Sequence, residues 1–145
     1  MSLRVAGFVV PNMTTTNMFS GNSTFPYTKG AMLASMGARI AGCMQAGSSE
    51  NAPDQRILCS VSEDGGRTFP RFQQAVPSTD GPQWEPVLHY APPRLWLIYS
   101  EGSVSNHSRT GPQALWAAAS LDGGHSWGAR RLIFNASVAG WPRVW

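Results

Sequence analysis

Charged residues are scarce in this chain: Asp, Glu, Lys and Arg make up 13% of its 145 residues, and the formal net charge is +3. Lysine is almost missing, because Lys29 stands alone beside ten arginines, and Arg130-Arg131 is the only adjacent basic pair. A nucleic-acid-binding surface needs clustered basic residues, so we expect no nucleic-acid partner. The arginines either are solvated surface residues or have guanidinium groups that bind a carboxylate ligand; Arg56 is our candidate for the second role.

Long apolar runs are absent as well. No segment approaches the ~20 apolar residues of a membrane-spanning helix, so we expect no membrane insertion. The apolar stretch from Val5 to Val10 is too short for a convincing signal-peptide core.

Cysteine and histidine are few. Cys43 and Cys59 are the only cysteines, and the three histidines are scattered along the chain. Neither residue type has the spacing of a metal motif, so we expect no metal and no cofactor. The cysteines fall on expected neighbouring antiparallel strands, about equally far from the connecting loop. A cross-strand disulfide in an oxidising compartment and two free buried thiols both stay open.

Glycine and proline are plentiful, with 15 and 11 residues, as in turn-rich all-β proteins. The most informative feature is a repeat: Ser-x-Asp-x-Gly-x-(Ser/Thr)-(Phe/Trp) occurs at Ser62–Phe69 and at Ser120–Trp127, 58 positions apart. We call these the first and second turn motifs. Their defining residues are Ser62, Asp64, Gly66, Thr68, Phe69, Ser120, Asp122, Gly124, Ser126 and Trp127.

An apolar run precedes each turn motif, so each motif is expected to end one strand and start the next. The Asp accepts bonds from backbone amides, and the glycines supply positive φ. A repeat of this length with several strands per unit indicates a β-propeller, although two unrelated hairpin pairs in a sandwich remain an alternative. The expected strands are 30–36, 39–46, 55–62, 70–76, 84–90, 94–101, 113–120 and 129–134.

The motifs are Asp boxes, and their setting resembles the sialidase (neuraminidase-like) superfamily of six-bladed propellers. Phe25 to Phe69, Trp84–Leu88 and Arg94–Tyr99 look like the first two blades of that fold. The resemblance covers residues 25–145, after an irregular segment at 1–24. It implies blade one at about 30–76, blade two at about 84–134 and the start of a third at 141–145. Because two blades cannot close a ring, we expect a fragment completed by further blades.

The resemblance implies a retaining exo-glycosidase with a Tyr nucleophile polarised by Glu, an acid/base Asp and three arginines that grip the sugar carboxylate. The acid/base Asp belongs to the loop between the second and third strands of blade one. Here that loop offers Asp54, with Glu50 as the second candidate. The family's Arg-Ile-Pro-like motif is replaced, because Thr28 stands where its Arg would be and Lys29 is adjacent. Lysine meets a carboxylate as a point charge, without the bidentate fork.

Strand direction sorts the acidic residues between the two ends of the blades. Asp64 and Asp122 belong to the turn-motif end, where their role in the turn accounts for them. The opposite end collects five of the eight acids, as a substrate site or as a solvated rim. Glu85 and Glu101 are the substrate-binding candidates among them. The five acids are Glu50, Asp54, Asp80, Glu85 and Glu101.

Four asparagines begin glycosylation sequons: Asn12, Asn22, Asn106 and Asn135. This excess over chance favours a secreted, endomembrane or lysosomal protein, with coincidence in a Ser/Thr-rich chain as the alternative.

Together these features predict the N-terminal part of a sialidase-like exo-glycoside hydrolase that acts on acidic sugar termini and is catalytically incomplete as this fragment. The alternative is a non-catalytic Asp-box propeller module that binds glycans or proteins. In both cases the expected partners are a carbohydrate and the remaining propeller blades.

Overall fold

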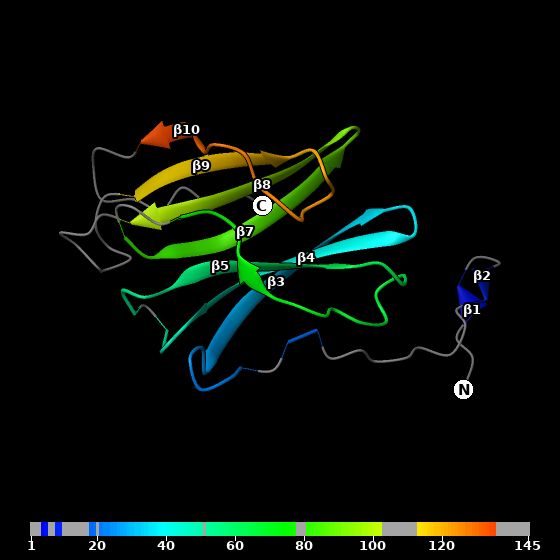
Figure 1. The fold of residues 1–145 in the computed structure, drawn as a ribbon, viewed down its shortest axis with the longest axis horizontal. Coiled ribbons are helices and arrows are strands. Elements are labelled where there is room, and N and C mark those ends of the chain that lie inside the picture. Colours follow the sequence, from blue (N-terminus) through cyan, green and yellow to red (C-terminus); the bar gives the residue numbers. More distant parts are fainter. Residues whose placement is uncertain are drawn as a thin grey trace.

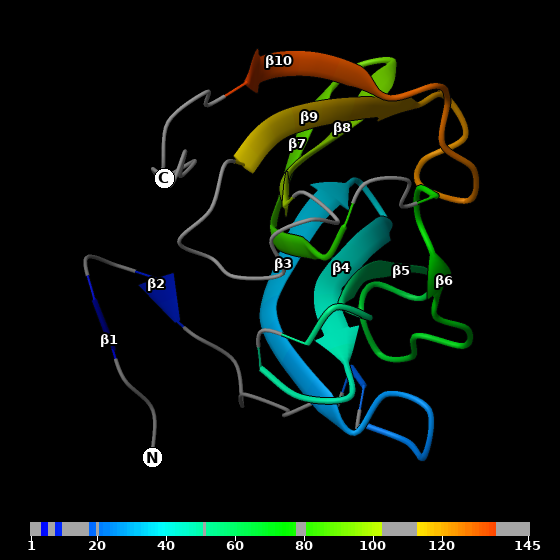
Figure 2. The same ribbon diagram turned by 90° about the vertical axis from the view of Figure 1, so that its left-hand side faces the viewer.

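The protein is all-β: two four-stranded antiparallel sheets and no helix make up the part of the chain that the structure describes. A computed structural model describes residues 18–19, 21–50, 52–77, 81–102 and 113–135, together with the backbone of a small hairpin. That hairpin pairs β1 (Arg4–Val5) with β2 (Phe8–Val9). In both views the second large sheet lies across the first (Figures 1 and 2).

The first sheet is a simple meander in the order β3-β4-β5-β6. Its strands are β3 (Tyr27–Met36), β4 (Arg39–Gly47), β5 (Arg56–Ser62) and β6 (Gln73–Gln74). The four predicted strands of this unit are therefore present, although β3 begins earlier than expected and the last strand is only two residues long.

The second sheet repeats the meander with β7 at one edge and β10 at the other. Its strands are β7 (Gln83–Ala91), β8 (Arg94–Gly102), β9 (Gln113–Ser120) and β10 (Arg131–Asn135). They match the four strands predicted for the second unit. The predicted start of a third unit at 141–145 lies outside the described residues.

The registers of the two sheets agree residue by residue. Ile40 pairs with Ser62 in the first sheet, and Leu95 pairs with Ser120 in the second. Each sheet has a register shift in its first strand, between Lys29 and Met32 and between Trp84 and Val87. The repeat seen in the sequence is therefore a repeat of the whole four-stranded unit, so each position in one sheet has a counterpart in the other.

The main core lies between the sheets. Ile57 on β5, Leu97 on β8 and Tyr99 on β8 are fully buried in it, and β7 is the strand that crosses the first sheet. Burial of such side chains stabilises the fold by roughly 1.5–3 kcal/mol each. A smaller apolar cluster covers the other face of the first sheet, with Met44, Ala46 and Leu58 packed under Met18, Phe19, Phe25 and Phe72.

A disulfide joins Cys43 on β4 to Cys59 on β5, inside the main core. The two residues are direct partners in the ladder, with Cα atoms 4.1 Å apart. The sequence left a disulfide and free thiols open; the structure has the disulfide. It indicates an oxidising compartment, extracellular or lumenal.

Candidate functional site

Candidate site residues gather at the end of the sheets opposite the turn motifs, which we call the loop end. The loop from Ser48 to Gln55 lies there because β4 ends at Gly47 and β5 begins at Arg56. β5 ends at the first turn motif, so the strand itself separates the two ends. The first residues of β3 join the loop end because Tyr27 pairs with Gly47.

Lys29 and Glu50 meet at the loop end. The Lys29 Nζ atom lies 2.9 Å from Glu50 Oε1, and both side chains are about half exposed. Thr28 and Lys29 also line a cavity of about 270 Å³ over β3. Its other lining residues are Met18, Phe19, Gly30, Ala31 and Met44. The cavity thus has an aromatic and apolar wall with a hydroxyl and an ammonium group, a mixture that suits a small amphipathic ligand.

Asp54 is held within its own loop. Its two carboxylate oxygens accept the backbone amide of Ser48 at 3.1 and 3.2 Å, and Oδ1 also accepts the Ser48 hydroxyl at 3.0 Å. The residue is exposed. These bonds fix the loop and engage the carboxylate, whereas a general acid must release a proton to the substrate.

Arg56 is likewise engaged by the loop. Its Nη1 atom donates to the carbonyl oxygens of Pro53 at 3.0 Å and Gln55 at 2.7 Å. The side chain therefore closes the loop against the start of β5. Neither contact is with a carboxylate.

Glu85 occupies an unusual backbone position on β7. Its φ is +52°, the only positive value on a non-glycine residue in the described chain, and Pro86 follows it. Gly30 is its counterpart in β3 and has φ +65°, so the register shift in the first strand requires this conformation. Glycine adopts it without strain, whereas a residue before proline is driven away from it. The Glu85 amide donates to Gln45 Oε1 at 3.1 Å, which holds the kink.

Glu101 is buried between the sheets rather than exposed on a rim. Its carboxylate accepts Arg130 Nη1 at 2.6 Å and Gln83 Nε2 at 2.9 Å. Gln83 Oε1 in turn accepts the Ile57 amide at 3.1 Å, so the chain of bonds crosses from the second sheet to the first. The Arg130 guanidinium lies 4.0 Å from the centre of the Trp116 ring, a cation–π distance.

Two side chains at this ion pair, Tyr99 and Arg130, have shifted pKa values. Burial raises the pKa of Tyr99 to about 12, although the neighbouring Arg130 opposes the rise. For Arg130, burial acts to lower the pKa, but the hydrogen bonds with Glu101 and Tyr99 and the attraction of their charges together outweigh it and hold the pKa above its ordinary value. The arginine therefore stays charged beside Glu101.

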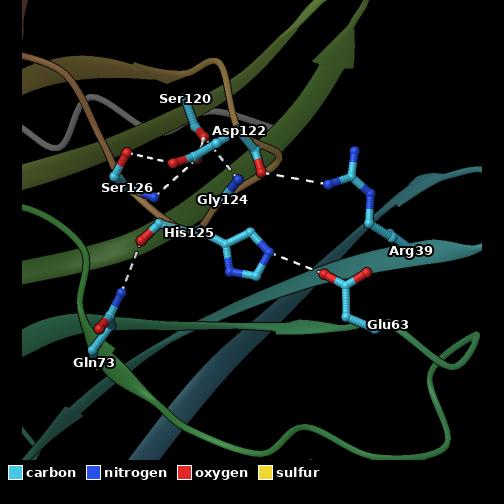
Figure 3. Close-up of polar contacts among 8 residues, drawn as sticks. All are labelled: Arg39, Glu63, Gln73, Ser120, Asp122, Gly124, His125 and Ser126. Carbon is cyan, nitrogen blue, oxygen red and sulfur yellow. Dashed lines mark hydrogen bonds and ion pairs between the residues drawn. The ribbon is translucent and has the colours of Figure 1, made fainter.

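The second turn motif is closed by its own side chains (Figure 3). The Ser120 hydroxyl donates to Asp122 Oδ1 and accepts the Gly124 amide, while Ser126 donates its amide and its hydroxyl to the same carboxylate. Burial acts to raise the pKa of Asp122, but the Ser126 and Ser120 bonds outweigh it and hold it well below its ordinary value.

The first turn motif has the same bonds. Ser62 donates to Asp64 and accepts the Gly66 amide, and Thr68 donates its amide and hydroxyl to Asp64. The Ser62 hydroxyl and then the Thr68 groups hold the pKa of Asp64 well below its usual range. Both aspartates are thus fully engaged in their turns, which lie between the third and fourth strands of their sheets as predicted.

The two turn motifs also contact each other across the sheets (Figure 3). His125 Nε2 lies 2.9 Å from Glu63 Oε1, and Gln73 Nε2 donates to the His125 carbonyl at 2.9 Å. Gly124 has φ +103°, and a Cβ there would lie 3.2 Å from side-chain atoms of Leu95 and Val61. The motifs therefore meet at one end of the molecule, and the second one rests on the first sheet.

Sequence reasoning missed two polar side chains of the interface, the buried Gln83 and the partly buried Arg130. The signal for Gln83 was weak: an amide just before an apolar strand reads as loop. Arg130 was read only as half of a basic pair. Among the other predicted residues, Asp80, Asn12 and Asn106 lie outside the described residues, while Asn22 and Asn135 are exposed.

No group of three or more His, Cys, Asp or Glu side chains able to hold a metal ion occurs among the described residues. The same residues contain no helix long and apolar enough to span a membrane. No protein-family model matches the sequence, and a search of curated proteins finds no significantly similar relative.

Proposed function

We propose that this chain forms two consecutive blades of a sialidase-like β-propeller, and that its loop end contributes to the carbohydrate site of an exo-glycoside hydrolase acting on acidic sugar termini. The observation that carries the proposal is the meeting of Lys29, Glu50 and the Asp54 loop at one end of the first sheet.

The proposal of a propeller is supported by a comparison of corresponding faces in the two repeated units. On the first sheet, the face toward the second is buried, as Val76 shows with 2% exposure. The counterpart of Val76 is Phe134, which is 53% exposed on the outward face of the second sheet. The same comparison holds for Ala41 and Cys43, which are buried, against Trp96 and Ile98, which are only partly covered. A third sheet of the same kind would cover this face as the second covers the first.

The outward face of the second sheet also has a groove that would accommodate side chains of a third sheet. A groove of about 370 Å³ runs across it and is walled mainly by apolar and small side chains. Its residues are Arg94, Trp96, Ala117, Ala119, Leu121, Gly128, Ala129 and Arg131. Phe134, which pairs with Leu115, adds further exposed apolar surface to this face on β10. Contiguous apolar surface of this kind marks an interaction site.

Chemistry at the loop end fits sugar binding. Lys29 supplies a positive charge for a carboxylate, Glu50 an acceptor for hydroxyl groups, and Phe19 a ring in the adjoining cavity. In this proposal Asp54 or Glu50 acts as the acid/base, with the Tyr, Glu and further arginines supplied by other blades. Arg56, Glu85 and Glu101 then shape the site: Arg56 closes the loop, Glu85 holds the kink of β7, and Glu101 ties the sheets together.

The second candidate is a non-catalytic propeller module that binds glycans or proteins. It is favoured by the bonds that engage Asp54 with Ser48, and by Thr28 at the position of the family's first arginine.

The test measures release of sugar from a panel of sialosides and other acidic glycosides by the full-length protein, which includes the remaining blades, and by its variants. Asp54→Asn or Glu50→Gln should slow turnover at least about a hundredfold, the usual contribution of a positioned general acid. Glu63→Gln is the matched control, because Glu63 is an exposed carboxylate at the turn-motif end; its turnover should not change.

Absence of sugar release from the whole panel would rule out the hydrolase. Binding of the same glycans, lost on Lys29→Ala, would then support the module. Equal turnover in Asp54→Asn, Glu50→Gln and the control would remove both carboxylates from the mechanism.

A further inference from the structure

Asn22 opens the sequon Asn22-Ser23-Thr24 in the loop before β3. Of the four sequons in the chain, it is the one whose three residues all lie within the described part. The loop is exposed from residue 21 to residue 24.

The Asn22 side chain is fixed in a defined orientation. Its Oδ1 atom accepts the backbone amides of Thr24 at 2.9 Å and Phe25 at 2.8 Å. Only the oxygen of a side-chain amide can accept two N–H donors, so Nδ2 points away from the turn with its two hydrogens. Among the described residues no hydrogen bond uses this nitrogen, and the side chain lies in solvent.

The turn at Asn22 is closed by residues next to it in the sequence, and Phe25 attaches it to the first sheet. All the partners of Asn22 lie within three residues of it, including the Phe25 carbonyl that accepts the Asn22 amide at 3.1 Å. A Cβ on Gly21 would lie 2.8 Å from the carbonyl oxygens of Phe25 and Pro26, so the chain reverses tightly there. The turn therefore depends on neighbouring residues, and Phe25 attaches it to the first sheet by packing on the cluster around Met44.

The disulfide also indicates the kind of compartment in which exposed sequons receive glycans. The Cys43–Cys59 disulfide indicates an oxidising lumen or exterior. Proteins that pass through such a eukaryotic compartment receive glycans on exposed Asn-x-Ser/Thr sequons.

We propose that Asn22 is an N-glycosylation site of this protein. The donor is an oligosaccharide linked through its anomeric carbon to a lipid pyrophosphate. Asn22 Nδ2 forms the bond to that carbon, the bond from the carbon to the pyrophosphate oxygen breaks, and Nδ2 loses one proton to a base of the transferase. Oδ1 takes no part in bond formation, so both of its hydrogen bonds, and with them the turn, persist in the glycosylated protein.

The test uses the protein secreted by eukaryotic cells with its disulfide formed. Peptide mapping by mass spectrometry, before and after enzymatic removal of N-glycans, should show a glycan on Asn22 that is released with conversion of Asn22 to Asp. Two variants serve as matched controls. Thr24→Ala removes the sequon hydroxyl but keeps the amide donor, and Asn22→Asp keeps the acceptor oxygen. Both should be secreted and folded without a glycan at residue 22.

An unmodified Asn22 in the secreted, disulfide-bonded protein overturns the proposal, even where other asparagines carry glycans. A glycan that persists on the Asn22 peptide of the Thr24→Ala variant would also overturn it, because the sequon would then not be what directs the modification. Neither result bears on the proposed glycosidase activity.

Discussion

The buried ion pair between Glu101 and Arg130 offers the sharpest test of how the sheets are held together. The Glu101 side chain is 1% exposed and that of Arg130 is 17% exposed, with 2.6 Å between Oε1 and Nη1. Removing one member leaves the other charge in the interface without its partner. Such changes cost about 3–5 kcal/mol, whereas replacing both members with apolar side chains of similar volume is often nearly neutral.

We therefore expect Arg130→Met and Glu101→Leu each to lower the free energy of unfolding by about 3–5 kcal/mol. The double variant should cost far less than the sum of the singles. It retains one defect, because Gln83 Nε2 loses its acceptor, and an unmatched buried donor costs about 1–3 kcal/mol. Met at position 130 keeps contact with the Trp116 ring, since its thioether packs well on aromatics.

Urea denaturation followed by tryptophan fluorescence measures these differences, and equal m-values across the variants would license the comparison. The two single variants and the double variant form a thermodynamic cycle with the parent protein. Additive losses in the cycle would refute the reasoning, because they would mean that the two groups do not depend on each other. Losses below about 1 kcal/mol in both singles would show that solvent reaches the pair.

Two further predictions concern the frame around the site. Replacing both cysteines, Cys43→Ala with Cys59→Ala, should lower stability by about 2–4 kcal/mol in the same assay, because the disulfide closes a loop with a sequence separation of 16; a parent protein equally stable with and without reductant would contradict this. The pKa of Asp122 lies below its ordinary 3.8 in the folded state, so its contribution to stability is complete above that pH and is lost as the pH falls toward the folded value. Acid unfolding of Asp122→Asn should accordingly show a shallower loss of stability below about pH 4 than that of the parent, and identical acid limbs would count against the role of the carboxylate.

The strands could be predicted because the sequence pattern of one four-stranded unit occurs twice in the chain. Each turn motif has an Asp, a Gly and hydroxyl residues at fixed spacing, and the hydrogen bonds of Asp64 and Asp122 use those groups. The disulfide stayed open at that stage because spacing places the cysteines on neighbouring strands but does not fix the register. The register of β4 and β5 in the structure decides the question, because it pairs Cys43 directly with Cys59.

The candidate site was harder to predict than the strands. Glu50 and Asp54 lie in the loop between the second and third strands to which the sequence assigns them, but the sequence does not tell which charged groups engage each other. Asp54 and Arg56 turned out to be bound within their own loop, and Glu101 to be buried. A carboxylate that ends a strand looks the same in sequence whether it faces solvent or a neighbouring sheet. Only the packing of the second sheet on the first decides it.

Comparison of corresponding positions shows how the repeat was adapted. Met44 pairs with Leu58 in the first sheet, and Tyr99 pairs with Trp116 at the same place in the second. The full sets are Met44, Ala46, Leu58 and Phe72 in the first sheet and Tyr99, Glu101, Trp116 and Arg130 in the second.

The first set is apolar, and the side chains that cover it are also apolar, including Met18, Phe19 and Phe25. The second set contains an ion pair, and what lies over it is the first sheet, reached through the hydrogen bond from the Ile57 amide to Gln83. A backbone amide brought to an interface needs an acceptor; Gln83 supplies one with Oε1 and donates its Nε2 to Glu101. The ion pair is therefore best understood as the means by which one unit of the repeat docks on the polar backbone of its neighbour.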